Sequence, residues 1–141
     1  MLSDEDQDLI SITLEEGVLN INVGMPVIIA CNKSDLIGKW QQDPNNRYDF
    51  DWVMRHIRQF ALMFGASVFS VSSLKNRGLE TLYKYVLHRL YEFDFPEKPE
   101  LRDEESIVIP SGFDNPALVK QLAPENQEPL ENKFKSKAEK V

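Results

Sequence analysis

The sequence predicts an α/β fold, because two short apolar segments typical of β-strands alternate with two segments whose apolar residues recur at helical spacing. The strand segments are residues 26–31 and 67–71, and the helical segments are residues 50–64 and 79–90. The order strand, helix, strand, helix is typical of βαβ units, which have right-handed crossovers and a parallel sheet. We therefore expect two parallel neighbouring strands with the helices packed on their sheet.

The first strand is predicted by a continuous apolar run, Pro-Val-Ile-Ile-Ala-Cys at residues 26–31, between Gly24 and the polar Asn32. Such a run suits a strand that is buried on both faces of a parallel sheet. Residues 1–22 come before it and are polar and acidic without a sustained period, which is typical of a flexible lead-in. Folded structure is therefore expected to begin close to residue 23.

The first helix is predicted after a polar loop at residues 38–47, which contains Pro44. Asp49 or Asp51 can cap the start of the helix, and Gly65 can supply the left-handed residue beyond its end. The helix is expected to bury one apolar stripe on the sheet. The stripe consists of Phe50, Val53, Met54, Ile57, Phe60, Ala61 and Phe64.

The second strand, residues 67–71, leads through a polar turn at residues 72–78 into the second helix, which ends before Phe95 and Pro96. The stripe of this helix consists of Leu79, Leu82, Tyr83, Val86 and Leu90. Burial of the Ile57, Phe60, Leu82 and Val86 side chains is expected to contribute about 1.5–3 kcal/mol each. Two strands alone would leave much sheet edge and helix face exposed, so we expect further domain structure upstream.

Four regions follow from these patterns. Residues 1–22 are an acidic flexible lead-in, and residues 23–95 are a partial α/β domain. Residues 96–122 are rich in charge and proline, but the apolar residues between Ile107 and Phe113 can dock on the domain, so this is a largely irregular docking extension. Residues 123–141 are expected to be a disordered charged tail.

The charge pattern argues against nucleic acid and membrane as direct partners. The net charge is -7, and no Lys or Arg precedes Lys33. An acidic chain lacks the electrostatic attraction that dominates nucleic-acid affinity, and anionic membrane surfaces repel it. The longest apolar run, residues 25–31, is far shorter than the roughly 20 residues that span a bilayer. Cys31 is the single cysteine, so no intramolecular disulfide can form, and a reducing cytosolic setting fits best.

The motif Asn32-Lys33-Ser34-Asp35 directly follows the first strand, and Ser72-Ser73-Leu74 directly follows the second. Ligands in open α/β sheets bind beyond the carboxyl ends of the strands, so the two motifs are expected to be neighbours at a binding site. A purely structural alternative is that Asn32 and Asp35 form an Asx turn at the end of the strand.

This pair of motifs resembles the base-recognition half of Ras-like GTPases. The resemblance implies that Asp35 recognises the guanine base, Lys33 stacks along it, and Asn32 ties the two loops together. It also implies that Ser72 and Ser73 form the second loop. Leu74 occupies the position where lysine is most common in that family.

The phosphate half of such a site is absent from the sequence. No G-x-x-x-x-G-K-[ST] motif and no upstream D-x-x-G motif occur. Phosphoryl transfer depends on positioned charge around the phosphates, so the chain alone is not expected to be an enzyme. We predict no catalytic residue, no metal site and no required cofactor, and guanine nucleotide is expected only where the missing half is present.

Several segments together resemble the light intermediate chains of cytoplasmic dynein. Residues 14–27 resemble the family's L-x-x-G-x-L…N-L-G-I-P-V segment, and residues 50–66 resemble its F-D-x-x-x-x-H-I-R-K-F…Y-G-A helix. Residues 82–95 resemble L-V-Y-K-Y-I…L-Y-G-F-P-F. Residues 109–115, Ile-Pro-Ser-Gly-Phe-Asp-Asn, resemble I-P-A-G-W-D-N, which ordinary GTPases lack. The match at residues 109–115 is the most specific of these.

The resemblance implies a non-catalytic accessory subunit of the cytoplasmic dynein motor. Its Ras-like domain would bind the dynein heavy chain and contribute to cargo attachment, whereas cargo adaptors would bind a C-terminal segment that this sequence does not contain. Such a subunit is expected in the cytoplasm, associated with microtubules through dynein. Two alternatives stay open: a fragment of a conventional small GTPase that acts as a nucleotide switch, and an interaction module outside dynein with a degenerate GTPase domain.

Overall fold

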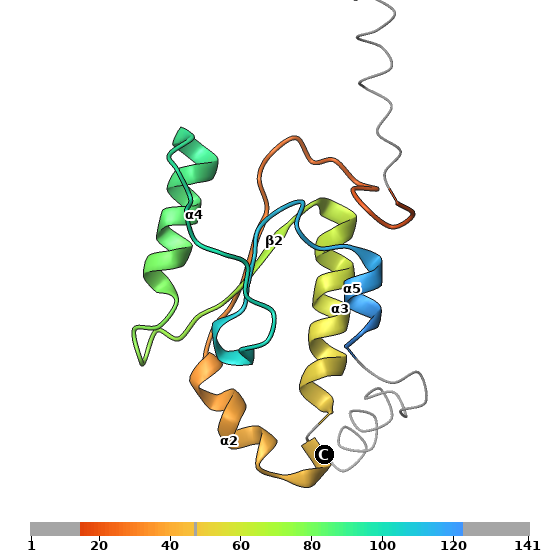
Figure 1. Cartoon of the computed structure of the whole chain (residues 1–141), viewed down its shortest axis with the longest axis vertical. Helices are drawn as coiled ribbons and strands as arrows, with labels where there is room; N and C mark the ends of the chain where they lie inside the picture. The colour runs from red at the N-terminus through yellow and green to blue at the C-terminus, as the bar shows by residue number, and fades with distance from the viewer. Residues whose placement is uncertain (1–14, 47, 123–141) are drawn as a thin grey trace, which may run out of the picture.

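The computed structural model of this protein describes residues 15–46 and 48–122. Most of the expected lead-in and the whole expected tail therefore lie outside the described residues. Helix α4 and helix α3 lie on the two sides of strand β2 (Figure 1). The strands and helices are β1 Ile28–Cys31, α2 Ile37–Gln41, α3 Asp49–Phe64, β2 Ser67–Ser70, α4 Leu79–Tyr91, β3 Val108–Ile109 and α5 Pro116–Lys120, with short 3-10 helices at Ser34–Leu36, Pro44–Asn46 and Glu104–Ser106.

The predicted α/β fold is confirmed, with β1 and β2 as adjacent parallel strands. Ile28 of β1 is aligned with Ser67 of β2, and Cys31 with Ser70. The third strand, β3, was not predicted: it comes from the extension and pairs antiparallel with β2, so that the strand order is β1-β2-β3. The extension is thus less irregular than expected, because it contributes a strand, a 3-10 turn and helix α5.

The expectation that the first strand is buried on both faces is wrong. Strand β2 is buried along its whole length, whereas β1 is only half-buried and Ala30 is exposed. The cause is position in the sheet: β2 has a neighbour on each side, and β1 lies at an edge of the described sheet. The apolar run correctly identified a strand, but burial depends on neighbours that the run does not specify.

The ends of α3 agree only partly with the predicted caps. Gly65 follows the helix in the left-handed conformation, with φ of 61°, as predicted. The residue at the N-cap position is Tyr48, and Asp49 and Asp51 lie in the first turn, where negative charge stabilises the helix dipole. The predicted loop at residues 38–47 is also wrong in part, because helix α2 covers its first residues.

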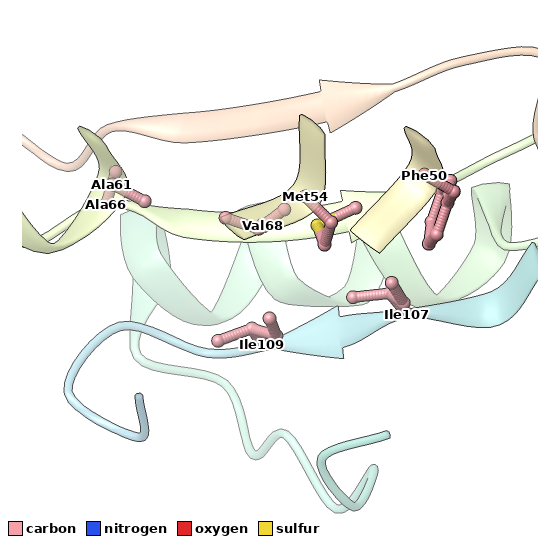
Figure 2. Packing of buried hydrophobic residues seen from close by; sticks show 7 residues of the cluster. All are labelled: Phe50, Met54, Ala61, Ala66, Val68, Ile107 and Ile109. Atoms are coloured by element: carbon pink, nitrogen blue, oxygen red, sulfur yellow. The ribbon is translucent and has the colours of Figure 1, made fainter. Parts of the chain in front are cut away.

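Helix α3 packs on one face of the sheet through Phe50, Met54 and Ala61 (Figure 2). Ile57 and Phe64 pack partly against the same cluster, as the predicted stripe requires. Phe60, however, is 53% exposed, so its predicted burial is wrong. The cluster shown in the figure consists of Phe50, Met54, Ala61, Ala66, Val68, Ile107 and Ile109.

Helix α4 packs on the other face through a side chain that the predicted stripe omitted. Tyr85 is fully buried against Phe69 of β2, with ring centroids 4.9 Å apart. Leu79 and Leu82 pack partly against the same cluster, whereas Tyr83 and Leu90 are each 63% exposed. The stripe is therefore rotated toward Tyr85 relative to the prediction.

The extension is fixed to the domain by one buried ion pair. The Arg58 guanidinium of α3 donates two hydrogen bonds to the Asp114 carboxylate, from Nε to Oδ2 at 2.7 Å and from Nη2 to Oδ1 at 2.6 Å. Both side chains are almost completely buried. Arg58 lies in the His-Ile-Arg segment at residues 56–58 and Asp114 in the Asp-Asn segment at residues 114–115, so the ion pair joins these two segments.

Further hydrogen bonds hold the same segment. The Ser111 hydroxyl donates to the Gly65 carbonyl at 2.6 Å, and the Ser111 amide donates to the Tyr85 hydroxyl at 2.9 Å. The Asn115 side chain accepts from the Leu118 amide at 2.9 Å and so caps α5. Ile107 and Ile109 are buried in the core cluster, so this part of the extension packs on the domain.

Arg58→Ala is expected to lower the free energy of unfolding by about 3–5 kcal/mol, because it leaves the Asp114 carboxylate buried without a counter-charge. The double variant R58M/D114L should be less destabilised than either single variant, since both charges are then removed together. Urea unfolding of the wild type and of the four variants R58A, R58M, D114L and R58M/D114L, followed by circular dichroism, measures this. Equal losses in R58M, D114L and the double variant would contradict the ion-pair account.

Candidate nucleotide-base site

The two predicted motifs lie side by side at the carboxyl ends of β1 and β2. Lys33 has left-handed backbone angles, with φ of 63°, and this turns the chain directly after the strand. The Ser34 amide then donates to the Val71 carbonyl at 3.0 Å, which joins the first loop to the end of the second strand. The expected proximity of the motifs is therefore what the structure shows.

Asn32 bridges the two loops through its side-chain oxygen. Its Oδ1 accepts from the Ser73 amide at 3.1 Å and from the Ser73 hydroxyl at 3.2 Å. The same oxygen also accepts from the Lys33 amide at 2.8 Å. An Asx turn would instead use the amide two residues along the chain, so the local Asx alternative is wrong for Asn32.

Asp35 also bridges the two loops. Its carboxylate accepts a hydrogen bond from the Ser72 hydroxyl. Ser72 is completely buried, and its hydroxyl oxygen in turn accepts from the Lys75 amide at 3.1 Å. One oxygen of the Asp35 carboxylate is therefore already used inside the protein, while the resemblance to Ras-like GTPases implies that this carboxylate faces a base.

Lys33 and Leu74 extend into solvent beside these bridges. Leu74 is 82% exposed, and the Lys33 ammonium makes no ion pair with any described residue. The role of these residues in binding a base stays a prediction.

Residues that no sequence motif indicates also fasten the second loop. Ser72 and Arg77 exchange two backbone hydrogen bonds of 2.9 and 3.0 Å, which close the turn. The Arg77 guanidinium pairs with the Glu105 carboxylate of the extension. Gly78 has φ of 73°, and a Cβ there would lie 2.7 Å from the Ser70 carbonyl oxygen, so only glycine fits this turn.

The described residues offer no metal centre and no membrane-crossing helix. Within residues 15–46 and 48–122 there is no group of three or more His, Cys, Asp or Glu that could hold a metal ion. In the same residues no helix is long and apolar enough to cross a bilayer. Cys31 lies at the end of β1, where burial raises the pKa of its thiol, which disfavours the reactive thiolate.

A groove of about 600 Å³ lies at the opposite end of the sheet, before the start of β1. Its walls come from the segment leading into β1, from the end of α3 and from the extension. Polar contributions come from Arg89 of α4 and from Asp114, whose carboxylate is held by Arg58. Its lining includes Leu19, Met25, Phe64, Arg89, Pro110 and Gly112.

Comparisons with known proteins agree on one family. A family model described as dynein light intermediate chain matches residues 1–135. The chain is 32% identical to human cytoplasmic dynein 1 light intermediate chain 1 over 115 residues, which are 80% of this chain and 22% of the relative. It is 30% identical to the Dictyostelium discoideum protein of the same name over 127 residues, 84% of this chain and 25% of that relative.

A solved structure shows the same fold. The crystal structure of the dynein light intermediate chain's conserved domain superposes with a TM-score of 0.65 at 21% sequence identity. The superposition covers 86% of this chain and 41% of that chain. This chain spans about a quarter or less of the length of the curated relatives above and less than half of the solved domain.

Ser72→Ala is expected to lower the free energy of unfolding by about 1–3 kcal/mol, because the Asp35 carboxylate and the Lys75 amide both lose a partner at a buried position. Ser73→Ala, which removes a single exposed hydroxyl, is the matched control and should cost less. Chemical denaturation of both variants measures the difference. A loss for Ser73→Ala as large as that for Ser72→Ala would show that the buried bridge is not the tie between the loops.

Proposed function

This chain belongs to the dynein light intermediate chain family, and we propose that it acts as a non-catalytic accessory part of a cytoplasmic dynein motor by binding the dynein heavy chain. The observation that carries the proposal is the family match over residues 1–135, which includes the extension as well as the α/β domain. The proposed location is the cytoplasm, on microtubules through dynein. Family membership sets aside the alternative of a conventional small GTPase fragment.

The extension supports the proposal as a structural part of a binding platform. Ile107 and Ile109 are buried in the protein's own core, so they are not available to a partner. We therefore assign heavy-chain binding to the surface that the extension builds with the segment before β1. Met25 is 69% exposed there and Phe113 is also exposed. An apolar wall with a polar rim is the usual composition of a protein interface.

The proposal that the chain is not an enzyme rests on its chemistry. Hydrolysis of a nucleotide needs amides, a lysine and a metal around the phosphates, and the sequence contains no motif that supplies them. Asp35 and Ser72 are engaged with each other, and Asn32 with Ser73. In this proposal the loops at residues 32–35 and 72–74 serve mainly to hold the carboxyl ends of β1 and β2 together. Cargo attachment would then be an activity of the assembled motor.

Met25→Glu is expected to weaken co-purification with a dynein heavy-chain tail fragment at least about tenfold, a loss of about 1.4 kcal/mol, because it places a charge on the apolar wall. Tyr48→Glu, an exposed aromatic at the far end of α3, is the matched control and should bind normally. Deletion of residues 1–11 should leave binding intact, since acidic side chains contribute mainly screened attraction. Normal binding by Met25→Glu, or loss of binding on the deletion with the fold preserved, would contradict the proposed surface.

Guanine nucleotide is expected to bind weakly or not at all. Base contacts supply selectivity, whereas much of the affinity of a Ras-like protein comes from its phosphate loop and magnesium. Titration calorimetry with GDP and magnesium should therefore detect no submicromolar binding, and Asp35→Ala should change little in that titration. A submicromolar affinity that Asp35→Ala abolishes would refute the non-catalytic proposal and favour a nucleotide switch.

A further inference from the structure

One arginine lies unpaired on the wall of the groove that precedes β1. Arg89 belongs to the last turn of α4, and it lines the groove together with the segment before β1 and the extension. Its guanidinium forms no ion pair with any residue of 15–46 or 48–122. A guanidinium offers several N–H donors in a planar fork that matches the two oxygens of a carboxylate. These donors are therefore available to a partner at the groove.

The other charged side chain of the groove is already neutralised. The Asp114 carboxylate accepts two hydrogen bonds from the Arg58 guanidinium and a third from the Asn115 amide at 3.0 Å. Asp114 is therefore not a counter-ion for Arg89. Among the described residues that line the groove, Arg89 supplies the one charge that is not neutralised, and this charge is positive although the chain carries a net charge of -7.

The walls beside this guanidinium are apolar and accessible. Met25 is 69% exposed and Leu19 is 39% exposed, and Pro110 of the extension lines the groove with them. The groove is also open at two glycines, because a Cβ at Gly24 or Gly112 would meet no atom within 4 Å. Its volume of about 600 Å³ lies within the range of about 300–1,000 Å³ that is usual for binding clefts. The groove therefore offers one cation beside an apolar surface.

We propose that the groove binds a segment of the dynein heavy chain in which an aspartate or glutamate lies near an apolar side chain, and that Arg89 pairs with this carboxylate. This inference rests on the proposed function, which assigns heavy-chain binding to the same surface, and it specifies the chemistry of the bound segment. The apolar side chain packs against Met25 and Leu19. An acidic segment is favoured over a basic or neutral one, because closing the groove over an unpaired guanidinium would bury a charge without a counter-charge.

Three substitutions of Arg89 separate recognition of a carboxylate from a structural role. A cation in the last turn of a helix also stabilises the helix dipole. Arg89→Lys keeps the charge but loses the planar fork, Arg89→Gln removes the charge, and Arg89→Glu reverses it. Arg102→Glu is the matched control, since Arg102 is also exposed but lies outside the groove, beside α2. Thermal unfolding of each variant shows whether the fold is kept.

The experiment measures the affinity of the full 141-residue chain for a dynein heavy-chain tail fragment by biolayer interferometry. We expect Arg89→Gln to weaken binding about tenfold and Arg89→Glu to weaken it further, with Arg89→Lys closer to the wild type and Arg102→Glu unchanged. Variants of the heavy-chain fragment in which single aspartates or glutamates are replaced by lysine are then tested against Arg89→Glu. One of them should restore the affinity to within about threefold of the wild-type pair, because the two charges are exchanged.

The results that contradict the inference are distinct from those that contradict the proposed function. Normal binding by Arg89→Gln and Arg89→Glu, together with loss of binding by Met25→Glu, would overturn the inference and leave the proposed surface standing. No binding by the wild-type chain would overturn the proposed function, and the inference with it. Equal losses for Arg89→Glu and Arg102→Glu, or no heavy-chain variant that restores binding, would exclude a direct pair between Arg89 and a carboxylate. Losses of affinity that run parallel to losses of melting temperature would assign Arg89 to helix stability instead.

Discussion

The packing of residues 107–120 on helix α3 depends on the ion pair between Arg58 and Asp114. Two charges removed from water are costly unless each satisfies the other, and here the guanidinium and the carboxylate meet through two short parallel hydrogen bonds. The pair fixes the segment that follows β3 against α3. From this fixed point Asn115 caps α5, and Ser111 reaches the end of α3. The ion pair therefore determines where the extension lies, while burial of Ile107 and Ile109 supplies much of the stabilisation.

The parts of the fold that local patterns determine were predictable, and the parts that depend on distant neighbours were not. The spacing of apolar residues, and the glycine, proline and polar residues that bound each segment, predict β1, β2, α3 and α4. Their positions therefore agree with the prediction. Burial within them does not follow. Arg58 is charged, so no apolar stripe includes it, yet a partner 56 residues away lets it be buried, whereas the apolar Phe60 is exposed. Tyr85 was missed for a related reason, since its hydroxyl has a partner in the Ser111 amide.

In the candidate site, too, some contacts could be predicted from the sequence and others could not. That Asn32 and Ser73 would be neighbours follows from topology, because the carboxyl ends of adjacent parallel strands meet at one edge. That Asp35 would hold Ser72 across 37 residues is a matter of side-chain geometry, which no spacing in the sequence encodes. The same is true of the Arg77–Glu105 pair, which links the second loop to the extension. The Asn32–Ser73 and Asp35–Ser72 bonds tie the two loops together.

Strand β3 has a consequence for how the protein behaves at high concentration. Only two residues long, it is paired with β2 on one side, and on its other side Val108 exchanges two backbone hydrogen bonds with Glu100. Within the described residues, the sheet therefore has a closed side and an open side. A fibril needs two open sides, because each subunit must accept one neighbour and offer itself to the next. A sheet with a single open side can pair with one neighbour but cannot extend a stack in both directions, so the geometry of the described sheet disfavours polymerisation through its edges.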